Sequence, residues 1–317
     1  MRRTVTDAIR RGFDNALANW PLLLFRIAEA IVTGLIIIAT IFVTIIPVLV
    51  SAGLSMSQFN TEKPQDLAEA FLNFLVYDWW IVLYVLFVVT VVGFVLMVLH
   101  SFVMGGIARV LVDGDRAGGD GKVRARFNVF SAERWIEGGK EMCWPLFWIY
   151  NIAYGIGVLV MLIPMLIFFA IVMATLRPFP PIAIFSGCVG ILITGAIGIV
   201  SIVLCTIWAQ KAIIVSAARG MNGRDSLRVG WQEFRADFGR HFVVAILMLM
   251  ITFGVSQAFN SFSMIFSTFQ PSPHDIASAI RSLFFPVRIA FSFIGGFITS
   301  AVGLWFLGSF AAITEPK

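Results

Sequence analysis

The chain has 317 residues, of which 59% are hydrophobic and only 13% are charged. Soluble domains are typically about 45–50% apolar and about 25% charged, so this composition excludes a soluble globular protein and predicts a membrane protein. The net charge of +5 comes from basic segments between apolar runs. Such segments favour contact with anionic lipid headgroups at a membrane face and do not point to a nucleic-acid partner.

Six apolar runs are long enough to cross the hydrocarbon layer as helices, because about 20 residues suffice. The runs are continuous and do not alternate apolar with polar residues, which favours helices over a β-barrel. They cover residues 21–50, 79–107, 145–173, 182–215, 242–268 and 286–312. We therefore expect an all-α polytopic membrane protein, with residues 1–317 forming a single membrane domain.

The basic residues indicate the orientation, because Lys and Arg accumulate in cytoplasmic loops. Of the 23 Lys and Arg residues, Arg26 falls inside the first span, and only a few fall on the far side: Lys63, Arg177, Arg281 and Arg288. The first apolar run is too long for a secretory signal, whose apolar core has about 7–15 residues. We therefore expect a multi-pass protein of the bacterial cytoplasmic (inner) membrane with both termini in the cytoplasm.

A short motif precedes the first and the fifth span. The segments T-D-A-I-R-R-G-F (6–13) and R-D-S-L-R-V-G-W (224–231) align without a gap and share an aspartate, an arginine and a glycine: Asp7/Asp225, Arg10/Arg228 and Gly12/Gly230. Over residues 7–19 and 225–237, apolar and charged side chains fall on opposite faces of a helix. Each segment is therefore expected to form an amphipathic helix at the inner membrane interface.

Further matches suggest three repeats. A third copy of the motif fits residues 131–145, where Trp144-Pro145 matches Trp20-Pro21; the Trp would anchor the interface and the Pro would begin the next span. On the outer side, P-Q-D-L-A-E-A (64–70) matches P-H-D-I-A-S-A (273–279). We expect three parallel units around a pseudo-threefold axis, each an interfacial amphipathic helix plus two spans, at about residues 1–112, 113–218 and 219–317.

Arg26 and Glu29 are the only oppositely charged residues well inside a span. Three positions apart on a helix, they can form an ion pair. Two interpretations stay open. Intramembrane ionisable residues often mark a transport pathway, and Glu29→Gln would then abolish activity in a folded protein. Alternatively, Arg26 extends to the headgroups and Glu29 only neutralises it.

Small residues recur every four positions in the fourth and sixth spans. The fourth-span set is Ser186, Gly190, Thr194 and Gly198, and the sixth-span set is Ser292, Gly296 and Ser300. Because small residues let helix backbones approach closely, both sets are expected to be packing faces. A sliding surface in a transporter is the alternative.

Residue types that carry catalysis form no recognisable pattern. The histidines (His100, His241 and His274) have no metal-ligand spacing, and the cysteines (Cys143, Cys188 and Cys205) contain no C-x-x-C. The segment D-G-D-R-A-G-G-D-G (113–121) lacks the distal acid of an EF-hand and any following G-K-[ST], so we expect a flexible cytoplasmic loop there. We expect no catalytic residue, no metal and no cofactor.

The interfacial helix before Trp20-Pro21 and Trp144-Pro145, together with G-M-N-G-R-D-S-L-R-V-G-W (220–231), carries a resemblance. The chain resembles uncharacterised bacterial six-span proteins, including the membrane domain fused to some glycerophosphodiester phosphodiesterases. The resemblance implies an integral membrane protein, and it implies no enzyme activity because no phosphodiesterase domain is attached.

Two functions follow from these expectations. The first is an accessory or scaffold module, without catalytic motifs, that organises lipid or a membrane-protein complex. The second is a small secondary transporter with its site among the repeats, near Arg26 and Glu29. Transporters of this kind usually have broken spans or several polar groups near the midplane. The spans here have few such groups, which favours the module.

Overall fold

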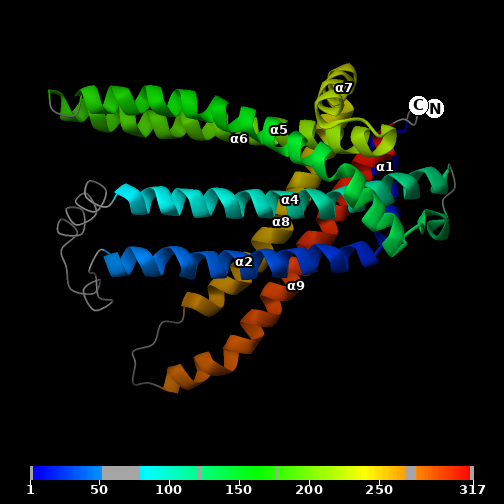
Figure 1. Cartoon of the computed structure of the whole chain (residues 1–317), viewed down its shortest axis with the longest axis horizontal. Coiled ribbons are helices and arrows are strands. Elements are labelled where there is room, and N and C mark those ends of the chain that lie inside the picture. The colour runs from blue at the N-terminus through cyan, green and yellow to red at the C-terminus, as the bar shows by residue number, and fades with distance from the viewer. Residues whose placement is uncertain (1–2, 52–78, 120–122, 176–177, 269–275, 315–317) are drawn as a thin grey trace. The chain divides into compact units, whose positions relative to one another are not determined.

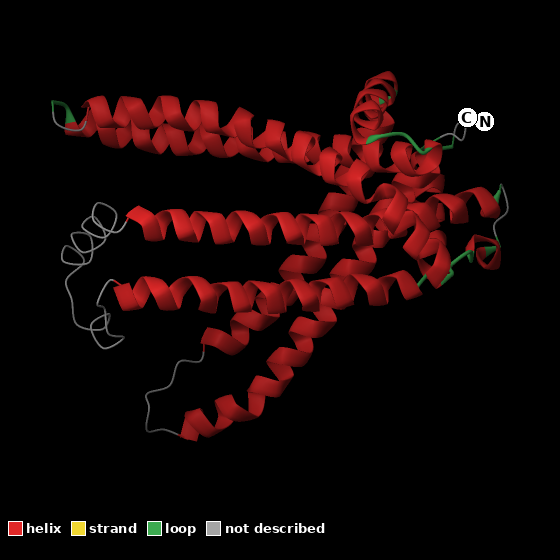
Figure 2. Cartoon of the chain, viewed as in Figure 1, coloured by secondary structure: helices red, strands yellow, loops and turns green. Residues whose placement is uncertain are grey.

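The structure is a computed structural model that describes residues 3–51, 79–119, 123–175, 178–268 and 276–314. Within these ranges, the side chains of residues 48–51, 180, 262–268, 276–290 and 292 are not described. Regular structure is helical throughout the described ranges (Figure 2). The predicted outer helix at residues 64–70 lies outside the described residues, as do residues 273–275 of the matching segment, including His274.

The elements are α1 (Val5–Ala18), α2 (Pro21–Ser51), α4 (Trp79–Gly118), the 3-10 helix η2 (Arg124–Phe127), α5 (Ala132–Thr175), α6 (Pro180–Arg219), α7 (Gly223–Ala236), α8 (Phe238–Thr268) and α9 (Ile276–Ile313) (Figure 1). Helices α2, α4, α5, α6, α8 and α9 are long and apolar enough to cross a membrane. The prediction of a six-span helical membrane protein is confirmed at this level.

The short helices α1 and α7 begin in the same way. Each has 14 residues, and each begins with a side chain that accepts a backbone N–H, Thr4 from Asp7 and Asn222 from Asp225. Such N-caps satisfy donors that have no partner within the helix. The prediction of a separate helix before the first and the fifth span is therefore correct in position.

The third copy of the motif differs from this pattern. Residues 132–175 form one helix, α5, so Pro145 lies inside it and the prediction that Pro145 begins a span is wrong. In the first copy, Asn19 stops α1 because its amide donates to Phe127 O and accepts from Val129 N–H. The aligned residue, Cys143, has no amide side chain to make these bonds, and the helix continues through it.

The glycine-rich segment after the second span also differs from expectation. Helix α4 continues to Gly118, so residues 113–118 are helical and the prediction of a flexible loop over residues 113–121 is wrong for this part. A buried stripe continues along α4 into the segment, through Ala108, Leu111, Val112 and Asp115. Tertiary burial of that stripe overrides the weak helix propensity of the glycines.

The chain divides into two compact units, each described by itself. Unit 1 contains residues 1–25 and 101–317, and unit 2 contains residues 26–100. The division follows packing and not the expected repeat boundaries. The single membrane domain and its repeat boundaries therefore stay predictions.

In unit 1, long helices pair as hairpins and short helices rest on their ends. Helix α5 packs along α6 and α8 packs along α9, while α1 lies on α9 and α7 on α6. Arg3 donates to Ala312 O, so the first described residues lie next to the end of α9, as the red ribbon beside the α1 label in Figure 1 indicates. We call this part of unit 1 the terminal end. It contains α1, α7 and η2, the last turns of α4, α6 and α9, and the first turns of α5 and α8.

Glycine allows the close approach of helices at the terminal end. A Cβ atom at Gly12 would clash with the Ser309 backbone of α9, and one at Gly230 would lie 3.1 Å from Ala212 Cα of α6. A Cβ at Gly138 of α5 would lie 2.5 Å from Arg109 Cβ of α4. Helix α1, helix α7 and the first turns of α5 therefore each touch a different long helix at a glycine.

Candidate functional site

A carboxylate in unit 2 lies between two basic side chains. Glu29 Oε2 accepts from Arg26 Nη1 at 2.6 Å, and Glu29 Oε1 lies 2.6 Å from His100 Nδ1. Arg26 and Glu29 are neighbours on one face of α2, and His100 comes from α4. We call these three residues the Glu29 group. Sequence reasoning found Arg26 and Glu29 but missed His100.

In the Glu29 group the carboxylate is buried and the two basic side chains are partly exposed. The side chain of Glu29 is 7% exposed, whereas those of Arg26 and His100 are 29% and 35% exposed. The same hairpin has a second polar contact, from the Tyr84 hydroxyl to Val43 O at 3.3 Å. This contact gives the register of α2 against α4 and sets His100 opposite Glu29.

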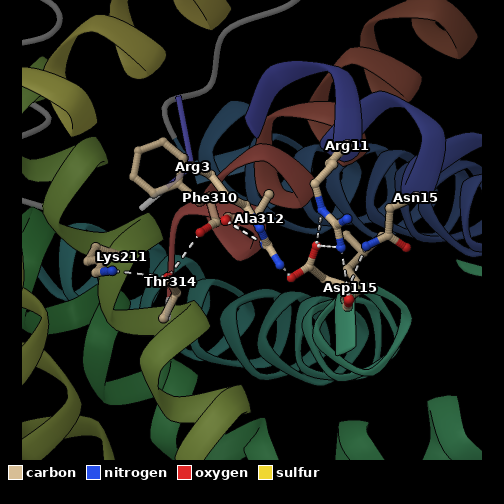
Figure 3. Close-up of polar contacts among 9 residues, drawn as sticks. Arg3, Arg11, Asn15, Asp115, Lys211, Phe310, Ala312 and Thr314 are labelled. Atoms are coloured by element: carbon tan, nitrogen blue, oxygen red, sulfur yellow. Dashed lines mark hydrogen bonds and ion pairs between the residues drawn. The ribbon is translucent and has the colours of Figure 1, made fainter. Parts of the chain in front are cut away.

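A second carboxylate, in unit 1, has the opposite arrangement. Glu233 of α7 lies 2.9 Å from Lys211 Nζ of α6 and also pairs with Arg219. Here the buried member is the base, because the Lys211 side chain is 2% exposed and the Glu233 side chain 27%. Lys211 also donates to Thr314 Oγ1 at 3.0 Å (Figure 3). We call Lys211, Arg219, Glu233 and Thr314 the Glu233 group.

The charges around Glu233 shift its pKa. Burial would raise the pKa of this carboxyl, but the charges and hydrogen bonds of Lys211 and Arg219 outweigh burial and hold the pKa below its ordinary value. The carboxylate is therefore ionised at neutral pH and compensates the buried ammonium of Lys211. This arrangement ties α6, α7 and the end of α9 together.

A third carboxylate, Asp115, lies at the terminal end, where a flexible loop was predicted from the sequence. Asp115 of α4 is 2.9 Å from Arg3 Nη1, and its Oδ1 accepts from Arg11 Nε at 3.0 Å (Figure 3). Both arginines have further partners. Arg3 Nη1 donates to Ala312 O, Arg11 Nη2 donates to Asp115 O, and the Arg11 guanidinium lies 4.9 Å from the Phe127 ring centroid. These contacts link α1, α4 and α9.

The small-residue sets are placed as follows. A Cβ at Gly190 would lie 2.6 Å from Phe168 Cβ of α5, and one at Gly198 would lie 3.2 Å from Met161 Sδ of α5. The fourth-span set, with Ser186 and Thr194, thus borders the α5–α6 contact at these two glycines. In α9, a Cβ at Gly295 would lie 2.9 Å from Phe259 Cγ of α8, while a Cβ at Gly296 would meet no described atom within 4 Å. Ser300 is half-buried, and the side chain of Ser292 is not described.

Asn151 donates to Phe147 O of its own helix, whereas Lys211 bonds across helices as part of the Glu233 group. Within the described ranges, no three His, Cys, Asp or Glu side chains gather as metal ligands would.

Comparison with protein-family models, with curated proteins and with solved structures finds no match.

Proposed function

We propose that the protein is a non-catalytic module of the bacterial cytoplasmic membrane that organises lipid or a membrane-protein partner. One observation carries the proposal. Several charged side chains of unit 1 pair with each other at the terminal end, as Arg3 and Arg11 do with Asp115, whereas α5 and α6 leave large apolar side chains exposed along their length. Examples are Leu159 (61% exposed), Phe185 (70%), Ile191 (75%) and Leu192 (73%). Such surfaces need lipid chains or apolar protein against them.

We further propose that the chain contains three repeats. Besides their equal length, α1 and α7 share one type of tryptophan contact that supports this idea. Trp305 Nε1 of α9 donates to Ile9 O of α1 at 2.8 Å, and Trp208 Nε1 of α6 donates to Leu227 O of α7 at 2.8 Å. Ile9 and Leu227 are equivalent in the sequence alignment of the two motifs. The same type of contact therefore occurs at the same place in both proposed repeats.

The glycine contacts support a cyclic order of these repeats. Each inner helical segment lies on the second long helix of the repeat before it: α5 on α4, α7 on α6, and α1 on α9. The last of these contacts closes the circle, because α1 begins the first repeat and α9 ends the third. A cyclic order of this kind is what a pseudo-threefold axis along the membrane normal produces. The resemblance to uncharacterised bacterial six-span proteins belongs to the same proposal.

The orientation is also proposed. The terminal end holds Arg3, Arg11, Arg219 and Arg240 together with the other basic residues of α1, α5 and α7, and cytoplasmic loops are enriched in Lys and Arg. Both termini would therefore be cytoplasmic, with anionic headgroups next to the terminal end.

A photo-crosslinking side chain at Ile191 tests the main proposal. This position on α6 is 75% exposed, and Ile207 on the same helix, which is fully buried, is the matched control. We expect adducts with lipid or with another protein at Ile191 and none at Ile207 after irradiation of intact membranes. Adducts at Ile191 that form only within the same chain would contradict the proposal.

A second candidate function is a small secondary transporter, and the Glu29 group favours it. An ionisable residue inside a span often belongs to a transport pathway, and Glu29 is held between two bases there. In this case the purified protein would carry a small solute and no lipid or partner, and Glu29→Gln would abolish solute binding without unfolding the protein.

A further inference from the structure

The Glu29 group differs from the other two carboxylate groups in its donors. Arg26 uses only Nη1 for Glu29, and its Nε and Nη2 make no hydrogen bond to a described residue. The Arg26 side chain is 29% exposed. Arg11, in contrast, uses Nε, Nη2 and its ring-facing surface within the protein. Arg26 therefore has donors available for a ligand.

The depth of Arg26 fits the phosphate of a lipid. It lies five residues after Pro21, where α2 begins, which corresponds to roughly 7 Å of helix rise. Trp20, next to that start, is 58% exposed, as is usual for an aromatic side chain at the membrane interface. A guanidinium on a long apolar stem reaches from this depth to the headgroup level.

Apolar surface continues from the Glu29 group toward the middle of the hairpin. Eleven residues along a helix bring the chain back to nearly the same face. Ile37 therefore shares the face of Arg26 on α2, and Val89 shares the face of His100 on α4. These side chains are 44% and 53% exposed. Between His100 and Val89, Gly93 leaves open space, because a Cβ there would meet no described atom within 4 Å.

We propose that Arg26 binds the phosphate of an inner-leaflet phospholipid whose acyl chains lie along Ile37 and Val89. An arginine suits this role because its fork of N–H donors matches two phosphate oxygens. Glu29 and His100 are positioning residues: Glu29 orients the guanidinium, and His100 holds the second carboxylate oxygen. The inference rests on the proposed function and adds a lipid class and a site to it.

Native mass spectrometry of the full chain in nanodiscs tests this site. The probes are phosphatidylglycerol in a phosphatidylcholine background, diacylglycerol as a lipid without phosphate, and inorganic phosphate. We expect Arg26→Gln to weaken retention of phosphatidylglycerol by about tenfold, as expected for loss of a charged hydrogen bond. Arg26→Lys keeps the charge but loses the fork, and should lie between wild type and Arg26→Gln.

The matched control is Arg124→Gln. Arg124 is a basic residue that pairs with Asp14 and is 55% exposed, so this change removes one charge without touching the site. We expect retention as in wild type. Equal losses in Arg26→Gln and Arg124→Gln would overturn the proposal, because the effect would then be one of overall charge.

Glu29→Gln separates a binding role from a structural one. This variant keeps an oxygen that can accept from Arg26 Nη1 and orient the guanidinium, but it removes the negative charge that competes with the lipid phosphate. Retention should therefore increase, whereas disruption of a merely structural cluster would weaken retention in both variants. Parallel loss in Glu29→Gln and Arg26→Gln would therefore overturn the proposal. The melting temperature of each variant in nanodiscs is measured as well, so that a folding defect is distinguished from a loss of lipid binding.

The probes also distinguish a lipid phosphate from free phosphate. They show in addition whether a negative result concerns this site alone or the proposed function as a whole. Retention of phosphatidylglycerol but not diacylglycerol supports a lipid phosphate, whereas Arg26-dependent binding of inorganic phosphate alone would overturn the lipid as occupant. If wild type and Arg26→Gln retain lipid equally, this site is wrong while the proposed function stands. If wild type retains neither lipid nor a partner, the proposed function itself fails.

Discussion

The Glu29 group and the Glu233 group contain the same chemistry in opposite arrangements. Each has one carboxylate between two basic side chains. In the Glu233 group the lysine is buried and the carboxylate is partly exposed, whereas in the Glu29 group the carboxylate is buried and the two bases are partly exposed. Since a buried charge is tolerated only with its partner, the arrangement of the Glu233 group ties its helices together. The arrangement of the Glu29 group leaves basic donors on the surface, where they are available to an anion.

The largest difference between the two groups should be in stability. Glu233→Gln leaves the Lys211 ammonium buried with a weaker partner, and breaking a buried pair from one side costs about 3–5 kcal/mol. Glu29→Gln should cost less than about 1 kcal/mol, because Arg26 can turn toward water. Denaturant titration of both variants in detergent measures the free energies of unfolding. The double variant Lys211→Met with Glu233→Gln should recover much of the loss. Equal costs for the two single variants would remove the distinction.

A pair of glycine substitutions extends the comparison to packing around the two groups. Gly12→Leu places a side chain against the Ser309 backbone at the terminal end, and overpacking of this kind costs about 1–3 kcal/mol. Gly34→Leu, on α2 in unit 2, meets no described atom within 4 Å of its Cβ and should leave the melting temperature unchanged. A melting temperature that falls equally in both variants would show that α2 is as closely packed as α1.

The α5–α6 hairpin offers a smaller, matched test. Gly190→Leu would push Phe168 away from α6, whereas Gly195→Leu on the same helix meets no described atom within 4 Å. We expect a melting temperature lowered by an amount equivalent to about 1–2 kcal/mol for Gly190→Leu, and no change for Gly195→Leu. If Gly190→Leu is neutral, this hairpin does not depend on the small residue, and its two helices can separate.

The smallest expected effect is on the pH dependence of stability. The folded pKa of Glu233 lies below its ordinary value of 4.5, so its ion pairs contribute stability that is complete above that value. The contribution is lost as the pH falls through the lower, folded pKa. Thermal melts of wild type from neutral to acidic pH should show this loss, and Glu233→Gln should have a shallower acid limb. An identical acid limb in both proteins would assign the effect to other carboxylates.

Composition and periodicity were sufficient for the spans, since a run such as residues 21–50 is long and apolar enough to cross a membrane by itself. The starts of α1 and α7, close to Asp7 and Asp225, were likewise predictable, because the capping signals at Thr4 and Asn222 are local. The polar groups were harder to predict. Asp115 was assigned to a loop, although it continues a buried stripe from Ala108 and Leu111 that could have revealed its burial.

Partners that are distant in the sequence could not be read from local pattern. Asp115 depends on Arg3 and Arg11, more than a hundred positions away. His100 meets Glu29 only because α2 and α4 run side by side, as the Val43–Tyr84 contact shows. Once a hairpin is assumed, residues at similar distances from its connection face each other, and this rule could have paired the two.

The most direct test of the central claim is gentle extraction of the protein from native membranes, followed by mass spectrometry of the proteins and lipids that co-purify. We expect a stoichiometric membrane-protein partner or a defined set of retained phospholipids, in keeping with the exposed apolar surfaces of α5 and α6. A protein that emerges with neither, and instead carries a small solute whose binding depends on Glu29, would be a transporter and not the proposed module.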